Sequence, residues 1–410
     1  MPDMANLQLA LRNLVRNRKR GMIALLTVGM AVVAMTLADG FVQWVFWAMR
    51  EGTIQSQSGH IQVVRPGYFQ AGAADPHAFL LPVTDAVRQT LEKTPGVKLV
   101  APRLLATGLI SREGTTVSFI AEGVDPAKEH DLSKAINLVK GRDLSNGTAN
   151  EVILGNGLAR SLHASPGDTV ALLSNTASGG INAVEAKVAG IFVSTSQAYD
   201  DAALRLPITL AQSLIRVEGA HMWLVLLQDT AQTDDRLAEF RTRFPPAAHQ
   251  LEFVPWYQRA DFYNKTVALF SEQIHVLRII IAAIIVLSIS NILVMNVLER
   301  TGEIGTLLAV GIKRRQVLVL FALEGILLGG VGGIGGAGIG FGLAEIISAI
   351  GIPMPPPPGM EKGFTARINA DWTVLLQAFA IAFLTTSVAS IYPAWKASRL
   401  DIVNALRHNI

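Results

Sequence analysis

The sequence predicts an integral membrane α-helical protein with four transmembrane helices and a large α+β domain inserted between helices 1 and 2. Three observations carry this prediction: four long apolar stretches, a long segment of mixed composition between the first two, and basic residues gathered near alternate ends of the stretches. Half of the 410 residues are hydrophobic, only 16% are charged, and the mean hydropathy is +0.38. These values are typical of a chain that is partly embedded in lipid and partly aqueous.

Each apolar stretch is long enough to cross a bilayer, which needs about 20 apolar residues. The four stretches are Gly21–Trp47, Ile274–Leu298, Val317–Ile350 and Trp372–Ile391. Because the third is longer than one crossing requires, we expect it to tilt or to end in a partly exposed turn. The alternative for the first stretch is a cleaved signal peptide, but its apolar part is about twice the usual length.

Basic residues indicate the side of the membrane on which each connecting segment lies. They gather in segments 1–20, 299–316 and 392–410. The residues are Arg12, Arg16, Arg18, Lys19, Arg20, Arg300, Lys313, Arg314, Arg315, Lys396, Arg399 and Arg407. Positively charged segments face the cytosol, so these three segments are predicted to be cytosolic. The proline-rich segment 351–371 is then a short, stiff outer loop.

The first cytosolic segment, residues 1–20, is predicted to be more than a charged leader. Leu7, Ala10, Leu11 and Leu14 are spaced at i, i+3, i+4 and i+7. This spacing predicts an amphipathic N-terminal helix that lies on the cytosolic face of the membrane.

Between the first two spans, residues 50–272 are predicted to form an extracytoplasmic α+β domain, or two smaller ones. Runs rich in β-forming residues alternate there with helical patterns. The predicted strands lie at 61–64, 116–120, 169–173, 184–193 and 223–227. The predicted helices lie at 85–93, 158–162, 210–215 and 234–244.

The glycine-rich stretch Gly325–Gly342 is expected to serve helix packing. Each glycine costs a soluble helix about 1 kcal/mol relative to alanine, but in lipid it lets neighbouring helices approach closely. Four charged residues lie within or near the spans: Asp39, Arg278, Glu324 and Glu345. We expect snorkelling or structural pairing rather than an ion relay, because no ladder of carboxylates crosses the membrane.

The sequence contains no pattern that indicates catalysis. It has no Gly-Lys-Ser/Thr phosphate loop, no His-Glu-x-x-His and no Gly-x-Ser-x-Gly, and its eight histidines are scattered. The absence of cysteine excludes thiol nucleophiles and cysteine metal sites. The net charge of +3 is too small to indicate a nucleic-acid partner. The chain is therefore predicted to be non-enzymatic, with no catalytic residues, cofactor or metal of its own.

The charged turn between the second and third stretches gives the strongest indication of function. Residues Glu303–Ile312 are long enough for a helix of about 15 Å. Gly305, Ala309 and Gly311 are small enough to permit close docking, and a basic cluster follows at 313–315. We expect a short helix that docks on another surface; the alternative is an ordinary charged loop that anchors the topology.

This turn resembles the MacB/FtsX-type ABC transporter permeases. Its motif is Glu299-Arg300-Thr301-x-Glu303-Ile304-Gly305, then Ala309-Val310-Gly311-x-x-Arg314, then Phe321-x-x-Glu324-Gly325. The C-terminal Tyr392-Pro393-Ala394-Trp395-Lys396-Ala397-Ser398-Arg399-Leu400-Asp401-x-Val403-x-Ala405-Leu406-Arg407 is similar to the terminal signature of the same family. In the inserted domain, Ser58–Val63, Glu151–Ala159 and Pro166–Val170 are similar to the LolC/LolE lipoprotein-releasing branch.

The resemblance implies a permease subunit of a mechanotransmission-type ABC transporter in the bacterial inner membrane, with its large domain in the periplasm. Two LolD/MacB-type ATPase subunits would bind ATP and Mg, and a second permease, identical or homologous, would pair with this one. A periplasmic carrier or adaptor would receive the cargo. The residues implied in ATPase coupling are Glu299, Arg300, Glu303, Ile304, Gly305, Ala309, Gly311 and Arg314.

The leading expectation for the cargo is a lipoprotein that is released from the inner membrane. Its acyl chains would enter between the first and second spans of paired permeases. The candidate cargo residues are Met30, Ala34, Leu37 and Phe41 on one helical face, with Ile281 and Ile285 opposite. Plain packing or lipid contact is the alternative interpretation of these six residues.

Two other functions stay open under the same resemblance. One is a MacB-like efflux permease that passes drugs or peptides to an adaptor, although that kind usually carries its ATPase in the same chain. The other is an FtsX-like signalling permease that regulates a periplasmic hydrolase, although such proteins tend to have smaller outer domains.

Overall fold

The computed structural model describes Arg16 and residues 18–72, 75–82, 85–133, 136–145, 150–194, 196–355 and 364–399. The amphipathic helix predicted within 1–20 lies mostly outside the described residues, as do the middle of the proline-rich loop and the end of the cytosolic tail. The chain divides into two compact units. The helical unit comprises Met1–Trp47, Thr266–Pro353 and Thr365–Ile410, and the outer-domain unit comprises Ala48–Lys265 and Met354–Phe364.

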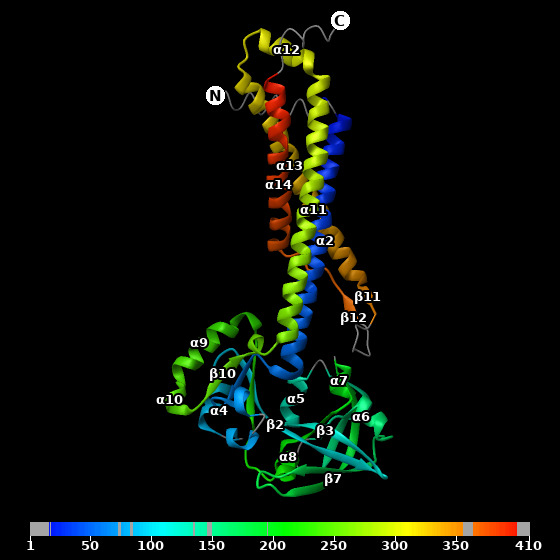
Figure 1. Ribbon diagram of the computed structural model, residues 1–410, viewed down its shortest axis with the longest axis vertical. Helices are drawn as coiled ribbons and strands as arrows, with labels where there is room; N and C mark the ends of the chain where they lie inside the picture. The colour runs from blue at the N-terminus through cyan, green and yellow to red at the C-terminus, as the bar shows by residue number, and fades with distance from the viewer. Residues whose placement is uncertain are drawn as a thin grey trace. The chain divides into compact units, whose positions relative to one another are not determined.

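Four of the described helices are long and apolar enough to cross a membrane (Figure 1). They are α2 (Arg18–Thr53), α11 (Asp261–Glu299), α13 (Arg314–Ile350) and α14 (Trp372–Ser398). Each contains one predicted span and extends past it. The first segment of the outer-domain unit therefore ends at Lys265 rather than at 272. Residues 392–398, which were predicted to belong to the cytosolic tail, are the last part of α14.

The core of the helical unit is made by one apolar face from each long helix. Its buried members are Ala24, Val28, Val32, Met35, Ile285, Ile289, Leu293, Leu328, Ala378, Ala382 and Ala389. Ser290 Oγ also donates a hydrogen bond of 3.0 Å to the carbonyl of Ala389, which links α11 to α14. The remaining faces of these helices carry exposed apolar side chains, as expected of helices in lipid.

The glycines of α13 confirm the packing role expected of them. A Cβ on Gly332, Gly336 or Gly340 would meet α2, and a Cβ on Gly325, Gly329 or Gly333 would meet α14. The closest approach to the backbone of a neighbouring helix is at Gly336, where an added Cβ would lie 2.6 Å from the carbonyl oxygen of Gly29. Two glycine rows therefore let α13 lie directly against two neighbouring helices.

A pair of alanine substitutions tests this packing. Gly336→Ala should destabilise the helical unit by about 1–3 kcal/mol, because the added methyl group overlaps backbone that cannot rotate away. Gly335→Ala is the matched control, since nothing lies within 4 Å of a Cβ there. Thermal unfolding in detergent measures both. Equal melting temperatures for the two variants would contradict the packing described.

One mixed sheet runs through the outer-domain unit in the order β10-β1-β9-β2-β3-β8-β5-β7-β4, and β6 pairs with both β2 and β7. The strands are β1 (Ile61–Val64), β2 (Val97–Arg112), β3 (Thr115–Val124), β4 (Asn137–Gly141), β5 (Glu151–Gly155), β6 (Thr169–Asn175), β7 (Ile181–Val193), β8 (Ala203–Pro207), β9 (Met222–Leu227) and β10 (Glu252–Pro255). Pairs β3–β8 and β5–β7 are parallel, and the other pairs are antiparallel.

The long strand β2 joins two lobes of this domain. Its first half, to Arg103, pairs with β9, and its second half pairs with β3 and β6. The first lobe therefore contains β10, β1, β9 and the start of β2, around the fully buried Trp223. The second lobe contains the remaining strands, around residues such as Phe119 and Leu204.

Short helices cover the two lobes (Figure 1). They are α3 (Tyr68–Ala71), α4 (Ala86–Glu92), α5 (Pro126–Leu132), α6 (Asn156–Ser161), α7 (Gln197–Asp200), α8 (Ile208–Ile215), α9 (Thr233–Arg243) and α10 (Pro246–His249). The first strand of the domain, β1, and its last strand, β10, both belong to the first lobe. They are adjacent and antiparallel, with Ile61 opposite Pro255. A two-stranded sheet of β11 (Ile352–Met354) and β12 (Phe364–Ala366) follows α13.

Candidate functional site

A short helix, α12 (Thr301–Ala309), connects α11 to α13. Arg300 precedes it with a non-helical backbone, which separates α12 from α11. The helix is followed by Gly311, whose φ of +99° is a left-handed conformation that glycine adopts without steric cost. Because local backbone conformation sets both ends, α12 is a distinct helical element. It covers Thr301–Ala309 rather than the predicted 303–312, since the chain leaves the helical conformation before Gly311.

One face of α12 is buried against helices of its own chain. Ile304 and Leu308 are only 2% and 8% exposed, and Gly302 and Gly305 beside them are also buried. The other buried members of this cluster are Val297, Val317, Phe321, Ala394 and Ala397. These residues belong to α11, α13 and α14, so a displacement of α12 has to be shared by three long helices.

Arg300 adds an electrostatic link at the same place. Its Nη1 lies 3.0 Å from Glu324 Oε1 of α13, and its Nε lies 3.2 Å from Glu303 Oε2 of α12. The guanidinium also stands 5.6 Å from the centre of the Phe321 ring, a favourable cation–π distance. Glu324 is 4% exposed, so its charge depends on protein partners such as Arg300.

The acidic residues at the start of α12 are paired with basic residues from the beginning of the chain. Arg16 Nη2 lies 2.6 Å from Glu303 Oε2, and Arg20 pairs with Glu299. Burial alone would raise the pKa of Glu303, but hydrogen bonds from Arg16 and Arg300 outweigh it and hold the pKa below its usual value. Glu303 is therefore ionised at neutral pH.

The opposite face of α12 is largely exposed among the residues that the structure describes. Val310 is 81% exposed and Leu307 is 37% exposed, although both are apolar. Glu303, Thr306 and Lys313 are exposed around them. An apolar centre with a charged rim is the usual composition of a protein-docking surface. We call Leu307, Val310 and this rim the α12 docking face.

A second set of contacts holds the end of α2 within the outer-domain unit. There, α2 continues into the π-helix η1 (Ile54–Ser58). Glu51 Oε1 accepts a hydrogen bond of 2.9 Å from Thr230 Oγ1, which lies 3.0 Å from His60 Nε2. His60 Nδ1 in turn accepts from the Leu227 N–H at 3.0 Å. This chain of hydrogen bonds ties α2 to β1 and β9 of the first lobe.

A buried group of four charged side chains ties the same segment to the second lobe. Arg205 of β8, 1% exposed, donates to the carbonyl of Ser56 in η1 at 3.2 Å. It also pairs with Glu122 of β3 at 2.9 Å and with Glu129 of α5 at 2.7 Å. Arg103 of β2 pairs with the same two carboxylates, at 2.6 and 3.1 Å. We call these two sets of contacts together the α2 clamp.

The α2 clamp makes the stability of the outer domain depend on pH. Burial lowers the pKa of His60 from 6.5 to about 4, with smaller and opposing effects from nearby charges. The unfolded chain therefore binds more protons than the folded chain between these values, and stability should fall as pH drops from 6.5 towards 4. The expected loss is about 3 kcal/mol once His60 is protonated.

Thermal unfolding of the full chain between pH 7 and pH 5 checks this expectation. His60→Asn is the control variant, because its Oδ1 can accept the Leu227 N–H but does not titrate. The variant should lose part of the pH dependence of the wild type. Identical pH profiles for the two proteins would contradict the role given to His60.

No metal site is visible in the parts of the chain that the structure describes: no three His, Asp or Glu side chains lie close enough together to hold an ion.

Two family models match this chain. The model described as "MacB-like periplasmic core domain" matches residues 22–243, more than half of the chain. The model described as "FtsX-like permease C-terminal" matches residues 276–402. The chain belongs to the MacB/FtsX-type ABC permease family. The α12 helix lies in the second matched region of this permease, and the α2 clamp lies in the first.

Individual relatives agree with the family. The permease is 29% identical over 423 residues to "Macrolide export ATP-binding/permease protein MacB" of Rhodospirillum rubrum, a match that covers 98% of this chain and 60% of that one. It is 34% identical over 122 residues to "Uncharacterized ABC transporter permease YknZ" of Bacillus subtilis, covering 30% and 28%. This chain therefore aligns over nearly its whole length but spans only about 60% of the length of that MacB relative.

A solved structure is similar to about half of this chain. The periplasmic region of MacB from Actinobacillus actinomycetemcomitans aligns with a TM-score of 0.37 and 14% identity, over 52% of this chain and 95% of that one.

The residues that the resemblance implied in ATPase coupling lie on both faces of α12. Ile304 and Gly305 are buried against the permease's own helices, and Arg300 joins α12 to α13. Glu303, Ala309, Gly311 and Arg314 are exposed, and Glu299 at the end of α11 pairs with Arg20. The first group can transmit a movement and the exposed group can receive it. Val310 belongs to the family motif, but neither it nor Leu307 was among the residues implied in coupling, although both form the centre of the docking face.

The structure does not bring the six candidate cargo residues together within one chain. Met30 is 62% exposed and Ala34 is also exposed, while Leu37 and Phe41 are half-buried. All four lie on the side of α2 that faces away from Val28, Val32 and Met35 in the bundle core. Ile285 is fully buried in that core and Ile281 packs against it, so these two face the opposite side of α2.

Sequence analysis missed the four charged residues of the α2 clamp. Arg103, Glu122 and Arg205 each lie between apolar neighbours in their strands, where a charged side chain is rarely buried without a partner. That exception was the available signal. It could not be used, because the pairing of β2, β3 and β8 is not evident from sequence.

Proposed function

We propose that this permease transmits the work of ATP hydrolysis, performed by a partner ATPase, from the cytosol to its outer domain and thereby drives export of an amphiphilic cargo. The observation that carries the proposal is the two-faced α12 helix. Its buried face is fixed to three long helices, and its uncovered face offers an apolar centre with a charged rim. Family membership supports the ATPase as the occupant of that face.

The α2 clamp supplies the other end of this proposed path. A push on α12 would displace the helical unit, and α2 runs as one helix from that unit into η1. The carbonyl of Ser56 in η1 is held by Arg205, and Glu51 is held by Thr230. Movement of α2 would therefore pull on both lobes of the outer domain. In this proposal the cargo is moved on the outer side and does not pass through a central pore.

The partners in this proposal are two ATPase subunits that bind ATP and Mg, a second copy or homologue of the permease, and a periplasmic carrier or adaptor. The site of action is the bacterial inner membrane. Segments 1–20, 299–316 and 392–410 are cytosolic in this proposal, and residues 351–371 form an outer loop.

For the cargo, we favour MacB-like export over lipoprotein release. The name of the Rhodospirillum rubrum relative refers to macrolide export, and the match covers nearly the whole permease. Two of the motifs that pointed to the lipoprotein branch contain residues with structural roles. Gly59 adopts a φ of +59° and His60 belongs to the α2 clamp, while a Cβ on Gly155 would lie 2.3 Å from the Asp200 carbonyl oxygen. Because the domain fold explains these residues, they do not by themselves indicate a lipoprotein cargo.

The four candidate cargo residues on α2, Met30, Ala34, Leu37 and Phe41, give the test of this function. We call them the cargo row, or α2 row. The double variant Leu37→Asp and Phe41→Asp should abolish stimulation of ATP hydrolysis by cargo while the complex still assembles, because both side chains face away from the bundle core. Erythromycin and a synthetic triacylated lipopeptide serve as the two probes. The reconstituted permease and its co-purified ATPase are assayed with each.

Leu376→Asp is the matched control, since Leu376 is 67% exposed and lies near the corresponding end of α14. Stimulation by erythromycin alone would support MacB-like export, and stimulation by the lipopeptide alone would favour lipoprotein release. Unchanged stimulation in the double variant, or an equal loss in the control, would remove the α2 row from the cargo path. Purification without any ATPase would contradict the proposed function itself.

A further inference from the structure

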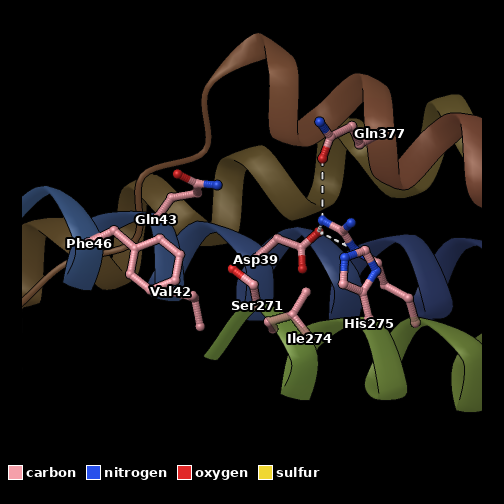
Figure 2. A pocket seen from close by; sticks show the side chains of 9 residues that line it. Asp39, Val42, Gln43, Phe46, Ser271, Ile274, His275 and Gln377 are labelled. Carbon is pink, nitrogen blue, oxygen red and sulfur yellow. Dashed lines mark hydrogen bonds and ion pairs between the residues drawn. The ribbon is translucent and has the colours of Figure 1, made fainter. Parts of the chain in front are cut away.

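A polar pocket of about 190 Å³ lies among α2, α11 and α14 in the otherwise apolar helical unit. Figure 2 shows the side chains that line it. Six of them are polar: Asp39, Gln43, Ser271, His275, Arg278 and Gln377. These polar groups lie beside the part of α2 that precedes Trp47. Polar clusters within membrane helices usually have a function beyond packing.

An ion pair forms one side of the pocket. Arg278 Nη2 and Nε lie 2.7 and 3.2 Å from Asp39 Oδ2, and Nη2 also donates to Gln377 Oε1 at 3.3 Å. These bonds use one oxygen of the carboxylate and two of the three guanidinium nitrogens. Arg278 Nη1 has no hydrogen-bond partner among the residues that the structure describes.

The second carboxylate oxygen is the unusual feature. Asp39 is only 4% exposed, and its Oδ1 is buried without a hydrogen-bond partner in the described part of the chain. In Figure 2 the second oxygen of Asp39 is directed towards the side of the pocket where Ser271 and His275 lie. A buried carboxylate oxygen is costly unless a donor satisfies it. The pocket therefore lacks one hydrogen-bond donor, and a cationic donor would form the stronger, charge-assisted bond to the carboxylate.

The remaining lining restricts the chemistry of that donor. Arg278 Nη1 offers a cationic hydrogen-bond donor near the carboxylate, which suits an anionic group of the same ligand. Val42, Phe46 and Ile274 form an apolar wall. A ligand with an ammonium group, a nearby anion and an apolar part satisfies all three. A quaternary ammonium does not, because it has no N–H to donate to Asp39 Oδ1.

We propose that this pocket binds the headgroup of a zwitterionic phospholipid that carries a primary ammonium group. The ammonium donates to Asp39 Oδ1, the phosphate lies against Arg278, and the glycerol and first methylenes follow the apolar wall. The site is separate from the cargo row, because Asp39 lies on the core-facing side of α2. It also does not depend on the α12 docking face, so it can fail while the proposed function stands.

Lipid retention by the full permease tests the proposal. The protein is exposed to vesicles of equal parts phosphatidylethanolamine, phosphatidylcholine and phosphatidylglycerol, and bound lipids are counted by native mass spectrometry. We expect phosphatidylethanolamine to be retained about tenfold over the other two, the preference that one charge-assisted hydrogen bond supplies. Equal retention of the three lipids by the wild type would overturn the proposal, whatever any variant does.

Two variants on α11 locate the preference. Ser271→Phe fills the pocket and should abolish the preference. Gln273→Phe adds the same ring at an exposed position two residues away and should keep it. A preference that survives Ser271→Phe in a folded, monodisperse protein would overturn the assignment of the site. Loss of the lipid preference in both Ser271→Phe and Gln273→Phe would also overturn the assignment.

A soluble competitor distinguishes a membrane lipid from a free headgroup. Glycerophosphoethanolamine has the same charges but no acyl chains, so it should displace the bound lipid only weakly. Displacement by it at the concentration of the lipid itself would overturn the lipid as the source of the headgroup.

Discussion

Replacing Arg205 by methionine is expected to destabilise the outer domain by about 3–5 kcal/mol. The substitution leaves Glu122 and Glu129, both less than 10% exposed, with one arginine between them. Burial by itself would raise the pKa of Glu122, but Arg205 and Arg103 outweigh burial and hold that pKa below its usual value. Without Arg205 the carboxylates must either repel each other or take up a proton. The hydrogen bond to the Ser56 carbonyl is lost as well.

Arg142→Met is the matched control for this prediction. Arg142 also pairs with a glutamate, Glu151, but 59% of its side chain is exposed to solvent. Exposed ion pairs contribute little to stability, so this variant should unfold close to the wild-type temperature. Thermal unfolding of the full chain compares the two. If Arg205→Met melts with the control, the buried cluster does not hold the end of α2 as described.

Charged substitutions on the α12 docking face are expected to uncouple the permease from its ATPase. The double variant Leu307→Asp and Val310→Asp should weaken ATPase binding at least about tenfold, because it places two carboxylates at the apolar centre of the face. The fold should be unchanged, since both side chains already face solvent in the isolated chain. Binding is measured by titrating the purified ATPase onto the permease in nanodiscs.

The control for this experiment is Lys396→Asp, which changes the charge of an exposed residue on α14 but leaves α12 intact. It should bind the ATPase nearly as well as the wild type does. A double variant that retains wild-type affinity and wild-type stimulation would show that the ATPase engages another surface. Precipitation or a lowered melting temperature would instead show that Leu307 and Val310 are needed for the fold.

The membrane helices and the family could be predicted from sequence because their signals are local. Four apolar stretches are visible without knowledge of the fold, and the motif around Glu303 is contiguous. Strands with strong runs of β-forming residues were also recovered: β1 is Ile61–Val64 in both the prediction and the structure. The predicted helix at 234–244 corresponds to α9, Thr233–Arg243.

Several of the strands that escaped prediction lack a local pattern. Strand β2 contains Pro102 and Gly108, and most of its first half is buried on both faces, so no alternation marks it. Strands β8 and β10 are four or five residues long and almost wholly buried. Their identity depends on pairing with distant strands, and pairing is a tertiary property. The buried cluster of the α2 clamp was hidden for the same reason.

Charges near the membrane spans show the same division. Asp39, Arg278 and Glu324 were recognisable from sequence as costly residues that need partners. Which residues pair depends on how the helices align: Arg278 reaches Asp39, and Arg300, outside the span, reaches Glu324. The pocket beside Asp39 exists only because three helices place their polar side chains at one level.

The central claim is that α12 is a cytosolic helix to which an ATPase binds. A single reporter cysteine tests it most directly. The natural chain has no cysteine, so Val310→Cys provides one thiol at an exposed position. We expect a membrane-impermeant maleimide to label it only from the cytosolic side, and bound ATPase to protect it. Labelling from outside the cell, or labelling that is unaffected by saturating ATPase, would contradict the account.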